Sequence, residues 1–310
     1  MTNLSAFQSK WAGRVAWSVI AAVAVVVWAG KARSAPQTFN TALPVAEGEF
    51  VFREQFVLDQ SGDDPSGANR DRTAMSAISV LGYGVNRNVS LFGVVPYADK
   101  RLELTESGAR RARSARGLGD ISLFGRYTAF KKDWRGRTFR IAPFAGIKVP
   151  TGDDDERDAF GSLPKSVQLG SGSWDPFAGV VVTYQTLDFQ IDTQISYKAN
   201  TDANDFKFGD VARLDSSFQY RLWPRTLDSG IPGFLYGGVE ANLIYQDKNQ
   251  SVGVDEINSN GTRLFLAPAL QYVTKRWIAE AAVQVPVYRN LNGTALEKDY
   301  TVRAGFRVNF

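Results

Sequence analysis

The 310-residue chain contains no cysteine and no histidine. Without cysteine it has no disulfide framework and no thiolate nucleophile. Without histidine it lacks the commonest metal ligand and the usual base at neutral pH, which excludes histidine-dependent triads, His-ligated zinc and haem held by histidine. Serine or carboxylate chemistry without histidine is formally open, but no adjacent nucleophile–base pair is visible. We therefore expect a protein that is not an enzyme and that has no catalytic residues, no metal site and no cofactor.

A long apolar run is also missing from the sequence after residue 35. The one such run, Val15–Gly30, follows the basic residues Lys10 and Arg14 and precedes the short sequence Ala32-Arg33-Ser34. This order is typical of a secretory signal peptide. A retained membrane helix is the alternative, but the run is shorter than the roughly 20 residues that a span needs. We predict a signal peptide at residues 1–34, cleaved near Ser34, and a short periplasmic segment at 35–48.

The chain has little excess charge once the leader is set aside. The whole sequence has 36 basic and 32 acidic residues, a formal net charge of +4. The leader contains Lys10, Arg14, Lys31 and Arg33 and no acidic residue, so removing it leaves 36 − 4 = 32 basic against 32 acidic residues. The net charge of the remainder is zero, which argues for no nucleic-acid partner.

What recurs between residues 49 and 310 is alternation of apolar and polar side chains, the pattern of a β-strand with two different faces. In Phe189–Lys198 the period of two is complete. Glu54 departs from it by falling on the apolar face of the first segment, which suggests a bulge, a strand end or a misread phase. About twelve segments carry the pattern: 49–58, 73–85, 89–102, 118–130, 139–149, 175–184, 189–198, 213–222, 235–246, 263–272, 277–288 and 300–310.

The connections between these segments are alternately short and long. Short ones lie at 86–88, 131–138, 185–188 and 274–276, and long ones at 60–72, 103–117, 151–173, 199–209 and 248–261. Outer-membrane barrels show this asymmetry, with short periplasmic turns, long external loops and an even strand number. Strands in lipid must also close into a barrel, because an open edge leaves backbone groups without partners. We predict an all-β, antiparallel transmembrane β-barrel of about 12 strands over 49–310, in the Gram-negative outer membrane, in contact with lipid bilayer and lipopolysaccharide.

The last strand, Tyr300–Phe310, has an apolar face that ends on an aromatic residue. Taken alone, it fits an edge strand of a soluble sheet as well as a membrane strand. Together with the leader and the repeated alternation, it resembles the C-terminal signal that the outer-membrane assembly machinery recognises. The residues expected to form that signal are Tyr300, Phe306, Val308 and Phe310.

Four short runs lie at the predicted junctions of strands and loops. They are Gly117–Ile121, Lys148–Gly152, Leu169–Pro176 and Gln284–Gly293. In this order they resemble the outer-membrane family named for the MetA pathway of phenol degradation, over roughly residues 49–310. The Pro-Thr-Gly and Gly-Ser-Gly-Ser-Trp-Asp-Pro sequences are the most specific parts. The resemblance implies a barrel involved in uptake of aromatic or other organic compounds, and it implies no particular functional residue.

The polar faces of the strands predict the lining of the lumen. The candidate pore-lining residues are charged, with a modest excess of cations: Arg126, Arg140, Lys148, Asp192, Lys198, Arg213, Asp215, Arg221, Glu240, Arg263, Glu280, Arg303 and Arg307. Such a charge ladder can set ion preference or orient a permeant. It can also pair across the lumen and close it. We expect a channel for passive passage of small organic, including aromatic, or anionic solutes; the alternative is a closed-lumen barrel for structure or surface interaction.

Two predicted external loops concentrate charge of opposite sign. Arg110, Arg111, Arg113 and Arg116 lie on one, and the acidic run 153–158 lies on the next. The arginines fit lipopolysaccharide phosphates, whereas the acidic run lacks the residue order of a calcium loop. Mutually screening, solvated loops are the favoured interpretation of both.

Overall fold

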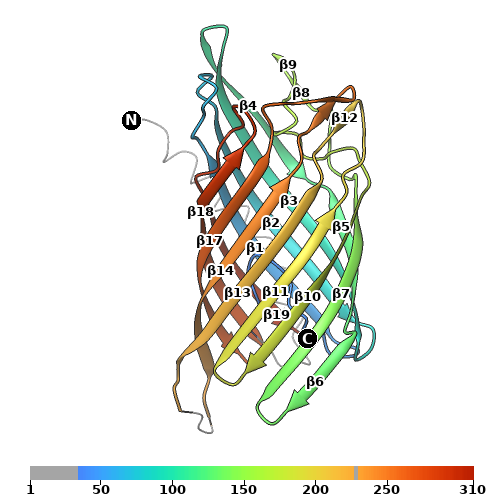
Figure 1. Cartoon of the computed structure of the whole chain (residues 1–310), viewed down its shortest axis with the longest axis vertical. Helices are drawn as coiled ribbons and strands as arrows, with labels where there is room; N and C mark the ends of the chain where they lie inside the picture. The colour runs from blue at the N-terminus through green and yellow to red at the C-terminus, as the bar shows by residue number, and fades with distance from the viewer. Residues whose placement is uncertain (1–33, 227–229) are drawn as a thin grey trace.

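The computed structural model describes residues 34–226 and 230–310, which form a single upright barrel (Figure 1). The predicted signal peptide, apart from Ser34, lies outside the described residues. Within the described part of the chain, no helix has the length and apolar character needed to cross a membrane.

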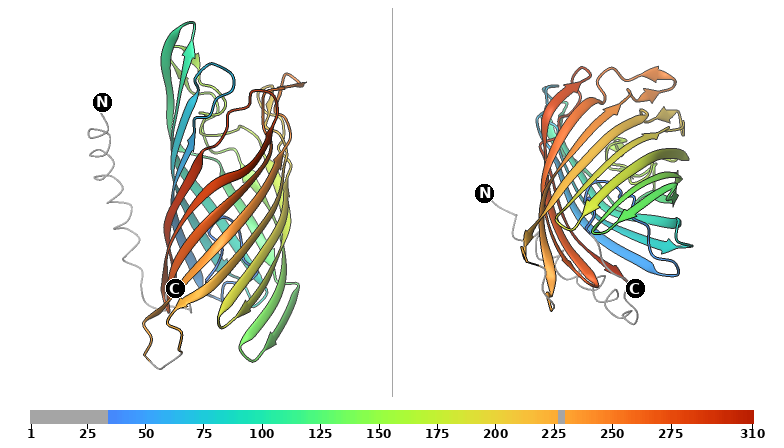
Figure 2. Two further views of the ribbon diagram at one scale, coloured as in Figure 1. Left: turned by 60° about the vertical axis from the view of Figure 1, so that its left-hand side comes forward. Right: turned by 60° about the horizontal axis from the view of Figure 1, so that its bottom comes forward.

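The main sheet contains 14 strands, of which β4 and β6 are hairpin arms, so that 14 − 2 = 12 strands form the wall. Each wall strand pairs antiparallel with its neighbours, and β1–β19 and β7–β10 pairings complete the closed ring seen in Figure 2. The prediction of an antiparallel transmembrane barrel of about 12 strands is confirmed. The wall strands are β1 (Phe50–Ser61), β2 (Asp71–Gly84), β3 (Val89–Glu106), β5 (Ile121–Tyr127), β7 (Arg137–Val149), β10 (Asp175–Thr186), β11 (Phe189–Lys198), β13 (Val211–Trp223), β14 (Gly233–Gln246), β17 (Gly261–Thr274), β18 (Trp277–Leu291) and β19 (Tyr300–Asn309).

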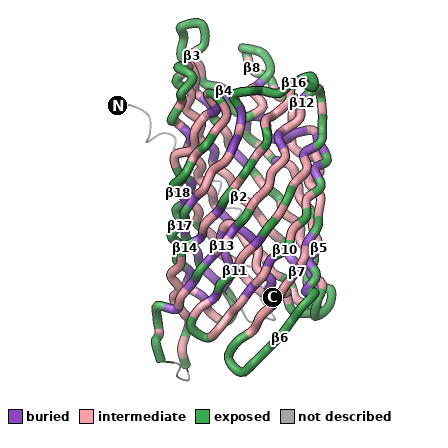
Figure 3. Tube along the Cα trace, in the orientation of Figure 1, coloured by how far each residue is buried: buried purple, intermediate pink, exposed green. Residues whose placement is uncertain are grey.

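The alternation in the sequence becomes an apolar outer face and a polar interior. On β11, for example, Gln190, Asp192 and Gln194 are buried inside the barrel, while the exposed Ile191 and Ile195 point outward. Buried positions recur in this way along the wall strands (Figure 3). Because successive side chains of a strand point to opposite faces, the sequence pattern alone fixes which residues enter the lumen.

Two connections differ from the prediction. The expected loop at 103–117 is a hairpin, in which β4 (Ala109–Leu118) pairs with the far end of β3. The expected turn at 131–138 contains β6 (Phe130–Trp134), which pairs with β7. The first hairpin turns at Ser107 and Gly108, which both have positive φ, so a two-residue turn replaces the predicted loop. Short strands also form in three other connections: β8 (Arg157–Asp158), β9 (Gly161–Ser162), β12 (Phe206–Lys207), β15 (Gln250–Ser251) and β16 (Val254–Asp255).

Glu54 is neither at a bulge nor at a strand end. It lies within β1 in regular register, opposite Phe306 of β19 and Ser79 of β2. Its phase is that of Phe52 and Phe56, so its side chain is on the outer face of the barrel.

Candidate functional site: the barrel lumen

The thirteen charged residues predicted to line the pore all occupy interior positions of the wall strands. The four predicted acids, Asp192, Asp215, Glu240 and Glu280, lie on β11, β13, β14 and β18, which follow one another on one arc of the ring except for β17. The arc from β19 through β1 to β7 carries Arg303, Arg307, Arg126 and Arg140. The first arc also carries Lys198, Arg213, Arg221 and Arg263, so the four predicted acids share one side with four bases, whereas the predicted residues of the other side are all basic.

The chain from Ser34 to about Ala46 runs through this lumen without regular structure. Gln37 and Ala42 are buried, with exposures of 2% and 0%. This stretch covers most of the segment 35–48 that the sequence predicts to be periplasmic. The structure puts it inside the barrel, a position that nothing in its composition indicated. We call residues 34–46 the luminal segment.

The side of the lumen that carries the four acids binds donors of the luminal segment. The Glu240 carboxylate accepts hydrogen bonds from the backbone N–H of Gln37 (2.7 Å) and of Thr38 (2.9 Å), and from the Thr38 hydroxyl. The hydroxyl oxygen of Thr183 accepts a bond of 2.8 Å from the backbone N–H of Ala42. Glu240 and Thr183 are fully buried, so these bonds satisfy polar groups that have no access to water.

The basic side binds carbonyl groups of the same segment. Arg126 donates to the carbonyl oxygens of Thr41 and Leu43, the latter at 2.7 Å. Arg53 donates to those of Pro36 (3.3 Å) and Gln37 (3.2 Å), and it forms a 2.6 Å ion pair with Glu280. A peptide chain presents both donors and acceptors. Carboxylate and hydroxyl oxygens on one side and guanidinium groups on the other thus bond to the two kinds of backbone group of the luminal segment.

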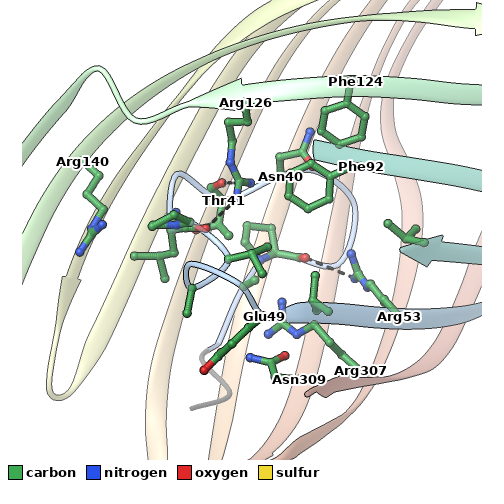
Figure 4. A pocket seen from close by; sticks show the side chains of 18 of the residues that line it. Asn40, Thr41, Glu49, Arg53, Phe92, Phe124, Arg126, Arg140, Arg307 and Asn309 are labelled. Atoms are coloured by element: carbon green, nitrogen blue, oxygen red, sulfur yellow. Dashed lines mark hydrogen bonds between the residues drawn. The ribbon is translucent and has the colours of Figure 1, made fainter. Parts of the chain in front are cut away.

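A cavity of about 700 Å³ opens beside the luminal segment, at the end of the barrel where β1 starts and β19 ends (Figure 4). We call it the vestibule. Six basic residues line it against two acidic ones, Glu47 and Glu49. Aromatic rings of Phe39, Phe92 and Phe124 complete the lining. The basic residues are Arg53, Arg87, Arg126, Lys131, Arg140 and Arg307.

One basic residue of the vestibule lies against aromatic rings, and another lies near a carboxylate. The Arg126 guanidinium lies 4.9 Å from the centre of the Phe92 ring, and that ring stacks on Phe124 at 4.7 Å. Arg140 approaches Asp133 at 3.7 Å. Cations beside aromatic faces favour a small anion that has an organic part, because charge and apolar surface are offered together.

The other end of the lumen is covered by the connection 151–173, where three of the four motif runs meet. Asp120 accepts hydrogen bonds from the backbone of Gly152 (3.0 Å) and Ser171 (2.9 Å), and from the Lys148 ammonium (2.9 Å). Lys148 also forms a 2.6 Å ion pair with the fully buried Asp175. The motif residues thus fix one loop across the barrel end, which supports their structural interpretation.

Below the tip of the β3–β4 hairpin, this loop has a small apolar core. Val167 and Leu163 pack with Ala98, Leu102 and Ala115. Arg113 bonds to Asp158 of the loop, and this hydrogen bond holds the pKa of Asp158 below its ordinary value. Arg113 is one of the four arginines predicted to lie on an external loop. The other three also have carboxylate neighbours: Arg110 with Glu103, Arg111 with Glu106 and Arg116 with Asp99. Among the residues described, no cluster of acidic side chains has the geometry to hold a metal ion.

Several residues of the lumen were missed by a search for charge. Gln219 and Gln271 donate to the carbonyl oxygen of Ala35 at 3.1 and 2.6 Å, and Gln194 accepts from Asn40 N–H at 3.3 Å. All three lie on the polar faces that the alternation predicts. The signal was present for these glutamines, but their uncharged amides were not counted as candidates. Arg53 was missed because Glu54 made the phase of its strand ambiguous.

Comparison with known proteins agrees with the barrel. A family model described as "Putative MetA-pathway of phenol degradation" matches residues 58–309. No curated protein matches the chain. Among solved structures, an outer membrane channel from Pseudomonas putida F1 is 12% identical, with 90% of this chain and 100% of that chain covered and a TM-score of 0.67. The transport unit of the Escherichia coli autotransporter AIDA-I is 10% identical, with 84% and 90% covered and a TM-score of 0.45.

Proposed function

Because the chain belongs to the family described as the MetA-pathway of phenol degradation, and has the fold of an outer-membrane channel, we propose that it passes small organic anions through the Gram-negative outer membrane. Passage is passive and no chemical step is involved. The luminal segment and the loop 151–173 restrict the path, so that only small solutes pass. Lipopolysaccharide around the wall and the assembly machinery that inserts the barrel are its further partners.

The vestibule is the observation that carries this proposal. It has a volume of about 700 Å³, six basic residues against two acidic ones, and three phenylalanine rings. A lumen lined by one sign of charge concentrates the opposite ion and sets selectivity. Aromatic side chains beside the cations extend the preference to anions with an apolar part.

A second candidate is a closed barrel that serves in structure or surface interaction. The bonds from Glu240, Thr183 and Arg126 to the luminal segment favour it. If those contacts are permanent, the lumen conducts nothing.

Single-channel recording with the purified barrel in planar bilayers tests the proposal. We expect measurable conductance, and a reversal potential under a salt gradient that corresponds to preference for the anion. Arg140→Gln, which removes one vestibule cation, should lower the anion-to-cation permeability ratio by about twofold. Arg276→Gln, in an exposed short turn, is the matched control and should leave the ratio unchanged.

A folded barrel that gives no conductance and no solute flux in liposomes would contradict the channel and favour the closed barrel. Cation preference in the wild type would contradict the choice of permeant while leaving the channel in place.

A further inference from the structure

Glu54 occupies a position that the transport function does not explain. In the register of the wall strands that the structure describes, it is the only acidic or basic residue that faces outward between the two aromatic ends of the wall. Phe50, Tyr83 and Phe310 mark the end where β1 starts, and Tyr300 and Tyr97 mark the other. Glu54 lies four residues after Phe50, about 10 Å along the membrane normal for a tilted strand. It is therefore inside the apolar band, which is about 25 Å tall in such barrels.

The carboxyl group has one hydrogen-bond partner among the described residues. The Ser79 hydroxyl, on the adjacent strand, donates to one carboxyl oxygen at 2.6 Å. The residue remains half-buried, and no lysine or arginine of the described chain forms an ion pair with it. A carboxyl group in hydrocarbon is unfavourable unless it meets a partner, and acyl chains offer neither a donor nor a cation. The position therefore indicates a polar partner that comes from outside the barrel.

Near Glu54, the strands β1 and β19 expose fewer large apolar side chains than the far wall does. Large apolar side chains stand exposed on the far wall, with Ile195 at 65%. On β1 and β19 the exposed large apolar residues are only the terminal Phe50 and Tyr300. Between them the rings of Phe52 and Phe306 lie beside each other, 6.1 Å apart. The small residues Ala77 and Ala304 are both opposite Phe56, one on each side of β1, with Ala281 beyond Ala304.

We propose that the face formed by β19, β1 and β2 is where two copies of this chain meet in the membrane, with Glu54 of each copy at the two-fold axis. A second copy is the partner that this surface fits, because a protonated carboxyl group at the axis can donate to, and accept from, the protonated carboxyl group of the other copy. Small residues let two walls approach closely in lipid. In a contact of this symmetry the outward residues of β1 and of its two neighbouring strands in one copy, Ala77 and Ala304 included, lie against the same strands of the other. This inference is independent of what the lumen conducts.

Disulfide cross-linking in isolated outer membranes tests the contact directly. The natural chain has no cysteine, so the double variant Ala77→Cys, Ala304→Cys has a clean background. Within one chain the two positions are separated by β1, about 10 Å, which is too far for a disulfide. Mild oxidation should give a covalent dimer. The control is Ala145→Cys, Thr193→Cys on β7 and β11, which flank β10 on the far wall. It should remain monomeric; equal yields from both pairs would overturn the proposal.

Native mass spectrometry of the detergent-extracted barrel tests whether the Glu54 carboxyl group and the small side chain of Ala304 stabilise the dimer. The wild type should be mainly dimeric. Glu54→Ala should raise the dissociation constant about tenfold, and Glu54→Gln, which keeps a polar group that both donates and accepts, should stay close to wild type. Ala304→Trp should also separate the copies, whereas Ala178→Trp, at an exposed position of β10 on the far wall, should not.

Heat modifiability of each variant shows that its barrel is folded, so that loss of the dimer is not confused with loss of the fold. A wild type that is monomeric or trimeric would overturn the pairing. A dimer that survives both Glu54→Ala and Ala304→Trp would place the contact on another face, which would also overturn it.

Discussion

At the scale of single residues, side chains of the lumen make the hydrogen bonds to the luminal segment that water would otherwise make. The segment needs them because its backbone has no regular secondary structure. Glu240 is fully buried and receives three hydrogen bonds from the luminal segment. Arg126 satisfies two carbonyl groups of the same segment from the opposite side. A backbone without secondary structure is tolerated inside a barrel only where such partners exist.

Glu240→Ala should therefore loosen the luminal segment. The change leaves two buried backbone N–H groups without an acceptor, at a cost of about 1–3 kcal/mol for each group that water does not reach. We expect a higher single-channel conductance, or more frequent openings, than in the wild type. Ser217→Ala is the control, because Ser217 is also buried in the lumen but makes no bond to the segment. An unchanged conductance in Glu240→Ala would mean that the segment does not limit flow.

At the scale of elements, the sequence motifs form one loop anchor. Gly152 and Gly170 belong to two different runs and are 18 positions apart, yet a Cβ atom on Gly170 would lie 2.1 Å from the Gly152 carbonyl oxygen. Asp120 bonds to the backbone of both runs. The conformational freedom of Gly170 matters less here than its lack of a side chain, since any side chain would separate the two runs.

Gly170→Ala should displace the loop 151–173 from the barrel end. The expected destabilisation is about 1–3 kcal/mol, as for an overpacked interior site, and urea unfolding followed by heat modifiability measures it. Gly93→Ala is the matched control, because a Cβ atom there would meet only the Leu123 side chain, at an ordinary 3.6 Å. A Gly170→Ala variant as stable as Gly93→Ala would show that the two runs are not under close packing.

The two predicted connections that became hairpins show a limit of prediction at this scale. Residues 103–117 are rich in arginine and polar side chains, which is typical of a loop. They form β3 and β4 instead because Ser107 and Gly108 adopt positive φ and bring the two arms together. Composition describes how a segment meets solvent, whereas a turn of two residues decides whether its flanks pair.

At the scale of the whole molecule, closure depends on the seam between the first and last strands. Phe310 extends this seam beyond β19: its N–H donates to the Phe50 carbonyl at 3.0 Å and its carbonyl accepts from Phe50 N–H at 2.7 Å. The two rings stack with centroids 5.7 Å apart. The last residue therefore takes part in closing the barrel, beside its predicted part in the assembly signal with Tyr300, Phe306 and Val308.

Deleting Phe310 should lower the amount of folded barrel in the outer membrane, because it removes two backbone hydrogen bonds and the ring expected to be recognised during assembly. Heat-modifiable mobility on gels and outer-membrane fractionation measure this amount. Phe310→Tyr keeps the bonds and an aromatic ring, and should assemble nearly as well as the wild type. Full assembly of the deletion variant would contradict the assembly signal.

The sequence by itself determined the strands, their inward faces and the closed barrel, because alternation with a period of two is a local property and lipid leaves no other arrangement for such strands. It could not place the luminal segment, since residues 35–48 carry no pattern and their position depends on Glu240, Arg126 and glutamines from distant strands. The sequence also could not explain why Glu54 falls on the apolar face of its strand. Only the ring order, which sets β19 and β2 on either side of β1, shows this carboxyl group on the outer wall beside Ser79.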